Sequence, residues 1–256
     1  MRLKLTFEAP NGLKLPLHYH YILQGFVLHN ISRPLAEFLH SIGYRNGNRV
    51  YKLITFSNLY GKSKVFKEEK QIFFPHSFHF YISSYDLNVL SDIANQLIGA
   101  EKLNFAGQEV FLSSIEPFKD TITTQKVILK TLSPVTVHET INDKTVYYNP
   151  YQEKFYQLLI KNLINKYSVI TGKTVSDNME ISQVRNFKYK KVVTFYKNNF
   201  IIEAWKGKFE IKAPLKIIEV ALKAGLGARN AQGFGMVAVE KREEESKNEK
   251  RDKSNF

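Results

Sequence analysis

The sequence predicts an α+β fold made of two tandem ferredoxin-like (RRM-like) βαββαβ modules with a C-terminal glycine-rich loop. Apolar residues alternate in strand-like and helix-like periods, and these periods follow the same order in both halves of the chain. Four glycines within residues 225–235 then precede a short strand-like run. No close sequence repeat is visible, so the duplication is inferred from the order of elements.

The first half begins with a strand and two helices and continues with the remaining elements of one module. The expected elements are a strand at 1–7, helices at 19–31 and 34–42, strands at 50–56 and 72–83, a helix at 86–98 and a strand at 103–115. Strands are predicted by alternation or aromatic content, and helices by apolar spacings of three and four residues. Pro34 suits a first helical turn. This order is the split βαβ pattern.

The second half repeats that order. The expected elements are a strand at 127–132 with a hairpin to residue 148, a helix at 151–167, strands over 180–196 and 200–211, a helix at 214–224 and a strand ending at 240. A linker is expected at 118–123. The predicted domains are therefore residues 1–120, residues 121–240 and a charged, disordered tail at 241–256, which is nearly free of apolar residues.

Composition indicates a soluble cytoplasmic protein. With 256 residues, 43% of them hydrophobic, the chain can bury a core. Its apolar runs are shorter than the roughly 18 residues that a membrane span needs, and the N-terminus alternates like a strand instead of a signal peptide. The absence of cysteine excludes disulfides and thiolate metal sites. Neither a metal nor another cofactor is expected.

The net charge of +13 predicts a polyanionic partner. Residues 1–120 carry 13 Lys and Arg against 10 Asp and Glu, residues 121–240 carry 18 against 9, and residues 241–256 carry 6 against 5. The excess lies in the second half, and such a field attracts nucleic acid by counterion release. General solubility is the alternative reason for a basic composition.

The glycine-rich loop is the most informative segment. It reads G-L-G-A-R-N-A-Q-G-F-G, with Gly225, Gly227, Gly233 and Gly235 around Arg229 and Asn230. Glycine reaches positive φ without steric cost, so the loop can approach either a phosphodiester chain or a neighbouring element. It lacks the G-K-[ST] of a Walker A loop, and it follows a helix where a dinucleotide-binding loop would follow a strand.

Three further segments carry a family resemblance together with this loop. They are L-P-L-H-Y-H-Y-I-L-Q-G, L-A-E-F-L-H-S-I-G-Y and Y-K-L-I-T-F-S. In order and spacing, over residues 1 to about 240, they resemble the superfamily of repeat-associated RNA-binding proteins of CRISPR systems. Within it, the chain is similar to the endoribonuclease that cuts CRISPR precursor transcripts into guide RNAs.

The resemblance implies a metal-independent endoribonuclease whose partner is the CRISPR repeat RNA of a precursor transcript. Attack by the 2′-OH would leave a 2′,3′-cyclic phosphate and a 5′-OH end. A second interpretation is a non-catalytic repeat-RNA-binding subunit of a multi-subunit CRISPR effector complex, and a third is a general RNA chaperone. A monomer and a homodimer both stay open, as do the repeat sequence and its need for a hairpin.

His40 and Lys52 are the first catalytic candidates. The expected buried side of helix 34–42 consists of Leu35, Phe38, Leu39 and Ile42. His40 falls beside it, and the resemblance gives a histidine here the role of general acid or base, for which imidazole titrates in the right range. The resemblance also implies a role for Lys52, which matches a position of the family at which a lysine stabilises the extra negative charge on the five-coordinate phosphorus. Without the resemblance, a structural histidine and a surface lysine are the ordinary interpretation.

The third catalytic group stays open. Some members of the family have a tyrosine shortly after the L-Q-G element, where this chain has Leu28. His29 is the adjacent titratable residue, although neighbours on a helix differ by about 100° in direction. His18, His20 and Tyr21 are further candidates, and a site of His40 and Lys52 alone is the remaining alternative.

RNA binding is expected from two segments of the second half. The first is basic and aromatic and contains Arg185, Lys188, Lys190 and Lys191, with Phe187 and Tyr189 between them. On a strand, the pleat would separate lysines that contact phosphate from aromatic residues, one face being core. The second is Arg229 and Asn230, in a loop that packs the modules together in many relatives. The aromatic cluster at 73–81 and Trp205 are assigned to core packing.

Overall fold

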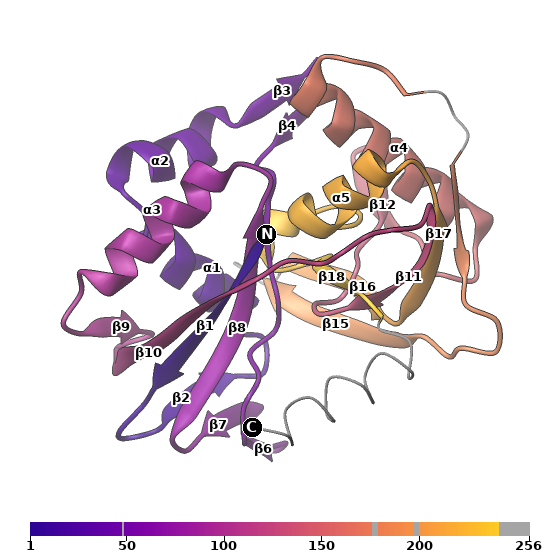
Figure 1. Ribbon diagram of the computed structural model, residues 1–256. Helices are drawn as coiled ribbons and strands as arrows, with labels where there is room; N and C mark the ends of the chain where they lie inside the picture. The colour runs from indigo at the N-terminus through magenta and orange to yellow at the C-terminus, as the bar shows by residue number, and fades with distance from the viewer. Residues whose placement is uncertain (48, 176–178, 197–199, 241–256) are drawn as a thin grey trace, which may run out of the picture.

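The computed structural model describes residues 1–47, 49–175, 179–196 and 200–240. Helices and antiparallel sheets together form the mixed α+β fold that the sequence predicts (Figure 1). The tail expected to be disordered, 241–256, lies outside the described residues. No helix in the described ranges is long and apolar enough to cross a membrane.

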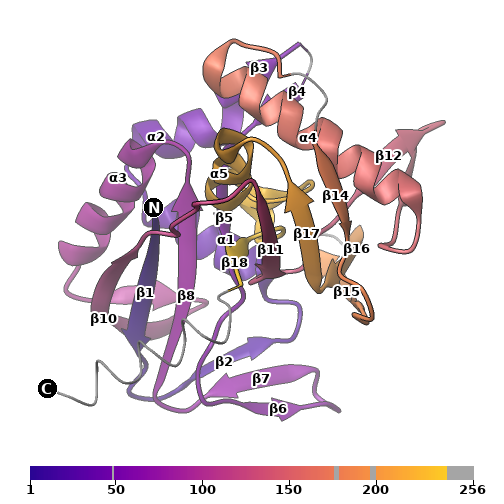
Figure 2. The ribbon, with the colours of Figure 1, turned by 45° about the vertical axis from the view of Figure 1, so that its right-hand side comes forward.

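A five-stranded antiparallel sheet organises the first half. Its strands, in spatial order, are β5 (Ile54–Phe56), β8 (Ser77–Ser84), β1 (Arg2–Glu8), β10 (Gln108–Phe118) and β9 (Leu103–Phe105). Alternate residues of β1 are buried, and they join the apolar sides of α1 (His20–His29) and α3 (Leu87–Ile98) in one core. The helices therefore cover one face of this sheet (Figure 2).

Two expected strands of the first half are each divided. Pro75 separates β7 (Gln71–Phe74) from β8, and β7 pairs with β2 (Leu13–Pro16) and β6 (Lys64–Phe66). The strand expected at 50–56 breaks at Leu53, whose φ is 51°. As a result, β4 (Arg49–Tyr51) pairs with β3 (Tyr44–Asn46), and β5 pairs with β8. The alternation of apolar residues over 50–56 did not predict that Leu53 would adopt a left-handed conformation.

A four-stranded antiparallel sheet organises the second half. Its strands, in spatial order, are β14 (Glu180–Gln183), β17 (Lys208–Lys212), β11 (Lys126–Thr131) and β18 (Val237–Val239). Both α4 (Glu153–Thr171) and α5 (Leu215–Ala224) share its buried core with Trp205, which is 5% exposed and confirms the packing prediction. Two hairpins flank it: β12 (His138–Ile141) with β13 (Lys144–Tyr147), and β15 (Lys190–Tyr196) with β16 (Phe200–Lys206).

The strand expected over 180–196 is wrong at 184–189, which is a loop between β14 and β15. Asn186 has a φ of 61°, which no strand residue adopts. The ring of Tyr189 stacks on Phe209 with centroids 5.3 Å apart. A Cβ at Gly207 would lie 2.2 Å from the Tyr189 ring, so this glycine makes room for it. The aromatic residues of this segment are therefore placed by close packing, and not by the alternation of side chains that a strand would give.

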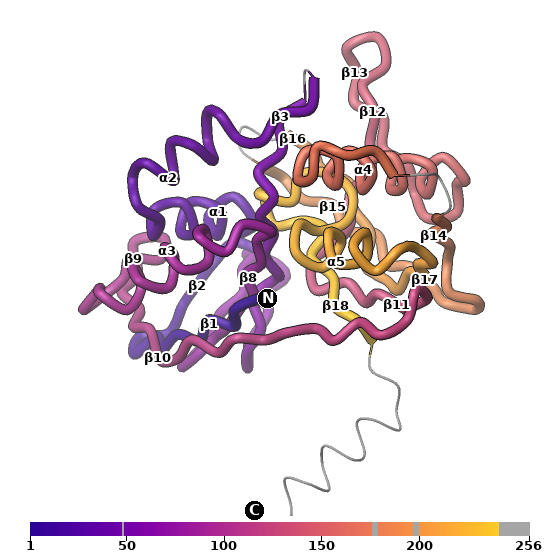
Figure 3. The backbone as a smooth tube through the Cα atoms, turned by 45° about the horizontal axis from the view of Figure 1, so that its top comes forward, coloured from indigo at the N-terminus to yellow at the C-terminus, as the bar shows by residue number. Residues whose placement is uncertain are grey.

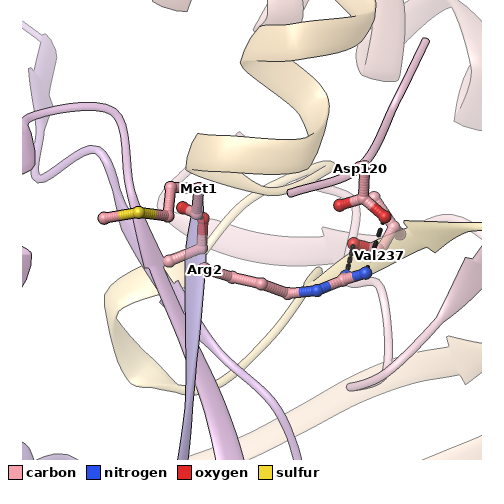
Figure 4. A network of polar contacts seen from close by, with 5 residues as sticks. Met1, Arg2, Asp120 and Val237 are labelled. Carbon is pink, nitrogen blue, oxygen red and sulfur yellow. Dashed lines mark hydrogen bonds and ion pairs between the residues drawn. The ribbon is translucent and has the colours of Figure 1, made fainter. Parts of the chain in front are cut away.

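The two halves lie side by side and are joined by the segment after β10 (Figure 3). Arg2, on β1, links the first half to this connecting segment and to β18. Its guanidinium donates to the Asp120 carboxylate at 2.6 Å and to the carbonyl of Val237 at 3.4 Å (Figure 4). Farther along, η2 (Asn230–Gln232) contacts β5. Thr55 also donates to the carbonyl of Phe234 at 3.2 Å, so the glycine-rich loop packs against the first half.

Candidate active site

His40 lies on a widened helical turn. The expected helix 34–42 begins as α2 (Arg33–Glu37) and continues as the π-helix η1 (Phe38–Ile42), a geometry found often at functional sites. Leu39 is its buried residue, whereas Ile42 is 55% exposed, so its assignment to the buried side is wrong. The extra residue in this turn alters which side chains face inward. His40 itself is exposed at the rim of a cavity.

Lys52 is brought to His40 by the turn between β4 and β5. Leu53 is held in its bend by hydrogen bonds from Tyr85 N at 3.0 Å and Ser84 Oγ at 3.1 Å to its carbonyl. Lys52 Nζ donates to the backbone carbonyl of His40. Partial burial lowers the pKa of Lys52. The two residues that the sequence places 12 positions apart are thus in contact.

Gly43 is required for this approach. It ends the π-turn with a φ of 59°, and a Cβ there would lie 2.8 Å from the carbonyl oxygen of Tyr51. Any other residue would push the turn that carries His40 away from the strand that leads into Lys52. The position of the histidine therefore depends on a glycine outside the glycine-rich loop.

His40 and Lys52 line a cavity of ≈ 90 Å³ at the junction of the two halves. The other lining residues are Gln24, Val27, Leu28, Leu39, Ile54, Phe56 and Ala231. The first half supplies the titratable groups, and the glycine-rich loop supplies Ala231. Leu28, at the position for which the family resemblance suggests a tyrosine, contributes an apolar wall.

His29 is not brought together with His40. It lines a different cavity with Phe26 and Asn104, because it points away from the side of α1 that carries Leu28. A role for His29 as a replacement for the tyrosine therefore has no geometric support. His29 is one residue after Leu28 on the helix, and this offset turns its side chain by about 100°.

The other titratable candidates also lie elsewhere. His20 is buried between Tyr19 and Phe234, and burial lowers its pKa to about 4. Tyr21 packs edge-on against Tyr196, and His18 packs edge-on against Phe195. Among the described residues, His40 and Lys52 are the titratable groups that share the cavity.

The glycine-rich loop folds back on itself. Gly225, Gly227, Gly233 and Gly235 have φ values of 80°, 67°, 84° and 75°. A Cβ at Gly235 would lie 2.0 Å from the carbonyl oxygen of Leu226, and one at Gly233 would lie 2.6 Å from the ring of Phe56. The glycines thus serve close packing within the loop and against the first half, one of the two uses that the sequence allows.

Asn230 is an internal brace of this loop. Its Nδ2 donates to the carbonyls of Leu226 and Phe234, both at 3.0 Å, and its Oδ1 accepts from Lys166 at 2.7 Å. The expected contact between Asn230 and RNA does not fit this geometry, because the whole amide is used inside the protein.

Lys166 is a central residue that the sequence analysis missed. It is 2% exposed on α4, and its Nζ donates to Ala224 O at 3.3 Å, Gly225 O at 2.6 Å, Gly227 O at 3.2 Å and Asn230 Oδ1. Burial lowers its pKa to about 7. The signal was available: Lys166 continues the apolar stripe of Leu159 and Leu163, where a surface lysine would not lie.

Arg229 is half-buried on the loop. Its φ is 57°, its guanidinium lies 4.7 Å from the ring centroid of Phe200, and its Nη1 donates to Gln232 at 3.3 Å. A second cavity, of ≈ 370 Å³, is lined by Arg229, Arg49, Lys52 and other residues of both halves. Cationic side chains therefore flank the His40 cavity.

The basic segment at 185–191 lies apart from both cavities. Its four cationic residues are exposed, and they are Arg185, Lys188, Lys190 and Lys191. Lys191 forms an ion pair with Glu203 at 2.8 Å, across the hairpin formed by β15 and β16. In the described parts of the chain, no group of three or more His, Asp or Glu is placed to hold a metal ion.

Comparison with known proteins gives matches along nearly the whole chain. Residues 116–239 match the family described as CRISPR associated protein Cas6, C-terminal. The chain is 27% identical over 255 residues to the CRISPR-associated endoribonuclease Cas6 1 of Methanocaldococcus jannaschii, covering 96% of each. It is 24% identical over 257 residues to the CRISPR-associated endoribonuclease Cas6 of Pyrococcus furiosus, covering 97% of this chain and 92% of the relative.

Solved structures share the fold. A Cas6-related protein from Pyrococcus furiosus has a TM-score of 0.79 at 21% identity, covering 95% of this chain and 99% of that one. A structure described as a RAMP protein binding different RNA substrates has a TM-score of 0.77 at 22% identity, covering 94% and 100%. The similarity in fold extends over both halves of the chain.

Proposed function

We infer that this chain is an endoribonuclease acting on CRISPR repeat RNA, because it is similar over nearly its full length to two CRISPR-associated Cas6 endoribonucleases and its residues 116–239 match the Cas6 C-terminal family. We propose further that it cleaves without a metal, by attack of a ribose 2′-OH on the adjacent phosphorus. The observation that carries this proposal is the contact between Lys52 and the turn that bears His40, at a cavity lined by residues of both halves.

The proposed reaction forms a 2′-O–P bond and breaks the P–O5′ bond. His40 takes the proton of the 2′-OH or gives one to the leaving 5′ oxygen. Lys52 stabilises the added negative charge on phosphorus. Its lowered pKa also makes its ammonium a better proton donor than an exposed lysine, so it is a candidate for the second proton transfer. The products are a 2′,3′-cyclic phosphate and a 5′-OH.

We propose that the two halves, residues 1–120 and 121–240, are tandem ferredoxin-like modules. The order β5-β8-β1-β10 in the first half and the order β14-β17-β11-β18 in the second support this. When the four strands of each half are numbered 1 to 4 along the chain, their spatial order in both sheets is 2-3-1-4. The first module supplies the reacting groups, and the second supplies the glycine-rich loop.

Most phosphate contacts are proposed to come from the second module. Its described cationic residues include the exposed Arg185, Lys188, Lys190 and Lys191, and Arg229 beside the cavity. Residues 121–240 carry 18 Lys and Arg against 9 Asp and Glu, which favours a nucleic-acid partner for this half.

The alternative is a repeat-RNA-binding subunit without useful activity, as part of a CRISPR effector complex. Leu28 favours it, since the cavity has an apolar wall where some relatives have a tyrosine. His40 and Lys52 favour the enzyme, because they are the titratable groups among the described residues that line this cavity, and a subunit that only binds RNA has no use for a general acid or base there.

A substrate with a single 2′-deoxy nucleotide tests the proposed reaction. Replacing the one 2′-OH before the cut with hydrogen should abolish cleavage at that bond while leaving RNA affinity nearly unchanged, because the nucleophile is removed. The measurement is single-turnover cleavage of end-labelled repeat RNA, with deoxy substitution at a neighbouring nucleotide as the control. Retained cutting of the deoxy linkage would mean that water, and not the ribose, is the nucleophile.

A further inference from the structure

The His40 cavity is the first of three adjoining cavities along a groove beside the glycine-rich loop. It shares Gln24, Lys52, Ile54 and Ala231 with the cavity of ≈ 370 Å³. That cavity in turn shares Arg49, Asn162, Gly227 and Ala228 with a third cavity of ≈ 190 Å³, which His138 lines. The three hollows therefore adjoin one another in a series from His40 to His138, with lining residues from β4, α4 and the glycine-rich loop, and this series is called the path below.

This path is cationic. Arg49, Lys52, Lys161 and Arg229 line it, and Glu139 is the carboxylate that its described lining contains. Glu139 is already engaged, since it accepts from Tyr148 at 3.0 Å and lies 3.6 Å from Lys154. A negatively charged chain that enters at Lys52 therefore meets further positive charge at Arg229 and Arg49.

The far end offers polar atoms without partners. His138 Nδ1 and Asn162 Oδ1, in the lining of the third cavity, are buried without a hydrogen-bond partner among the described residues, and so is Arg229 Nε in the adjoining cavity of ≈ 370 Å³. Native proteins satisfy most buried polar groups, so unpaired ones beside a cavity favour a ligand. Burial, Arg229 and Arg49 lower the pKa of His138 to about 4, so its imidazole is neutral near pH 7. A neutral ring and an amide suit the edge of a base better than a phosphate.

We propose that this third cavity is a nucleotide subsite. One base of the RNA, on one side of the scissile phosphate, inserts between β12 and α4 and is read by His138 and Asn162, while Arg49 and Arg229 hold the intervening phosphates. The inference rests on RNA being the substrate, as proposed above. The cavity volume of ≈ 190 Å³ is more than ten times the ~15 Å³ that one water molecule needs on the same measure. Single-stranded RNA is commonly recognised through such splayed-out bases.

The subsite is tested by measuring how the removal of single RNA bases affects binding to the wild type and to a double variant. The probe is unstructured RNA of the CRISPR repeat from the genome that encodes this chain, made as a series with one base removed at each position in turn. Binding is measured for the wild type and for His138→Ala with Asn162→Ala. We expect one position outside the cleaved dinucleotide at which base removal raises the Kd about 10-fold in the wild type, the usual size for one or two hydrogen bonds. In the double variant this penalty should disappear.

The control is Asn165→Ala, which removes an amide from the same helix outside the described lining of the groove. It should keep the wild-type pattern. Equal penalties at every position in wild type and double variant would overturn the subsite, including the case in which the cavity holds only water. Because the readout is binding, it separates this inference from cleavage: a wild type that binds but never cuts contradicts the proposed reaction alone.

The phosphate contacts have their own readout. Arg49→Ala should reduce the log–log salt slope of binding by about 0.7, the value for one contact on single-stranded nucleic acid. Arg45→Ala changes an exposed arginine on the paired strand β3, outside the described lining of the groove, and should leave the slope unchanged. An unchanged slope for Arg49→Ala would place the RNA elsewhere.

Discussion

His40→Ala is expected to slow single-turnover cleavage of the repeat RNA by roughly 10²- to 10⁴-fold, the usual contribution of a general acid or base. The side chain is exposed at the cavity rim and makes one hydrogen-bond contact, with Ser41 Oγ at 3.3 Å. Its loss should therefore change neither the fold nor the RNA affinity much. The measurement is the cleavage rate with protein in excess over end-labelled RNA, together with a Kd from the same preparation.

His29→Ala is the matched control for this prediction. His29 is also an exposed histidine at the end of a helix in the first half, but it lines a separate cavity. Its removal should leave the rate unchanged. Full activity of His40→Ala would remove His40 from the mechanism, and an equal loss in both variants would point to an effect of the fold.

Lys166→Met is expected to lower the free energy of unfolding by about 2–3 kcal/mol, because it keeps most of the side-chain volume but removes every donor. The carbonyls of Gly225 and Gly227 and the Oδ1 of Asn230 would then be buried without this partner. Relief of the buried charge offsets part of the loss. The measurement is chemical denaturation followed by Trp205 fluorescence.

Cleavage should fall in the same variant, since the loop that Lys166 holds contributes Ala231 to the His40 cavity. Lys161→Met, on the exposed side of the same helix, is the control for stability alone, because Lys161 lines the groove; it should change the free energy of unfolding by less than about 0.5 kcal/mol. If Lys166→Met is as stable as that control, the buried ammonium is not what holds the loop.

The stability difference between wild type and Lys166→Met should also depend on pH. An unfolded lysine titrates near 10.4, whereas burial lowers the pKa of Lys166 in the folded chain to about 7. Between these values the unfolded chain binds more protons, so the free energy of unfolding of the wild type, relative to the variant, rises as the pH goes from 7 to 10. A difference that stays constant over this range would mean that Lys166 titrates normally.

The order of the main elements was predictable because burial in each sheet repeats the apolar alternation, as in β1 and β17. Local departures were not predictable. The bend at Leu53 and the loop at 184–189 arise from contacts made by distant segments, such as Ser84 with Leu53 and Gly207 with Tyr189. Periodicity contains no information about such contacts.

Some residues of the candidate site could be predicted from the family resemblance, whereas others were found only in the structure. His40 and Lys52 were proposed from matching segments, whereas their contact depends on the π-turn and on Gly43. Asn230 was assigned to RNA together with Arg229, because the glycine-rich loop has no other obvious need for a cation, but Asn230 braces that loop. Lys166 was overlooked because a lysine is ordinarily a surface residue, even where its spacing follows an apolar stripe.

The chemical identity of the RNA ends tests the central claim most directly. The full chain is incubated with the repeat RNA in excess EDTA, and the ends of the fragments are determined. Attack by the 2′-OH at His40 and Lys52 predicts that the upstream fragment ends in a 2′,3′-cyclic phosphate and the downstream fragment begins with a 5′-OH. Fragments with a 5′-phosphate and a 3′-OH, or cutting that stops when EDTA is added, would contradict the account.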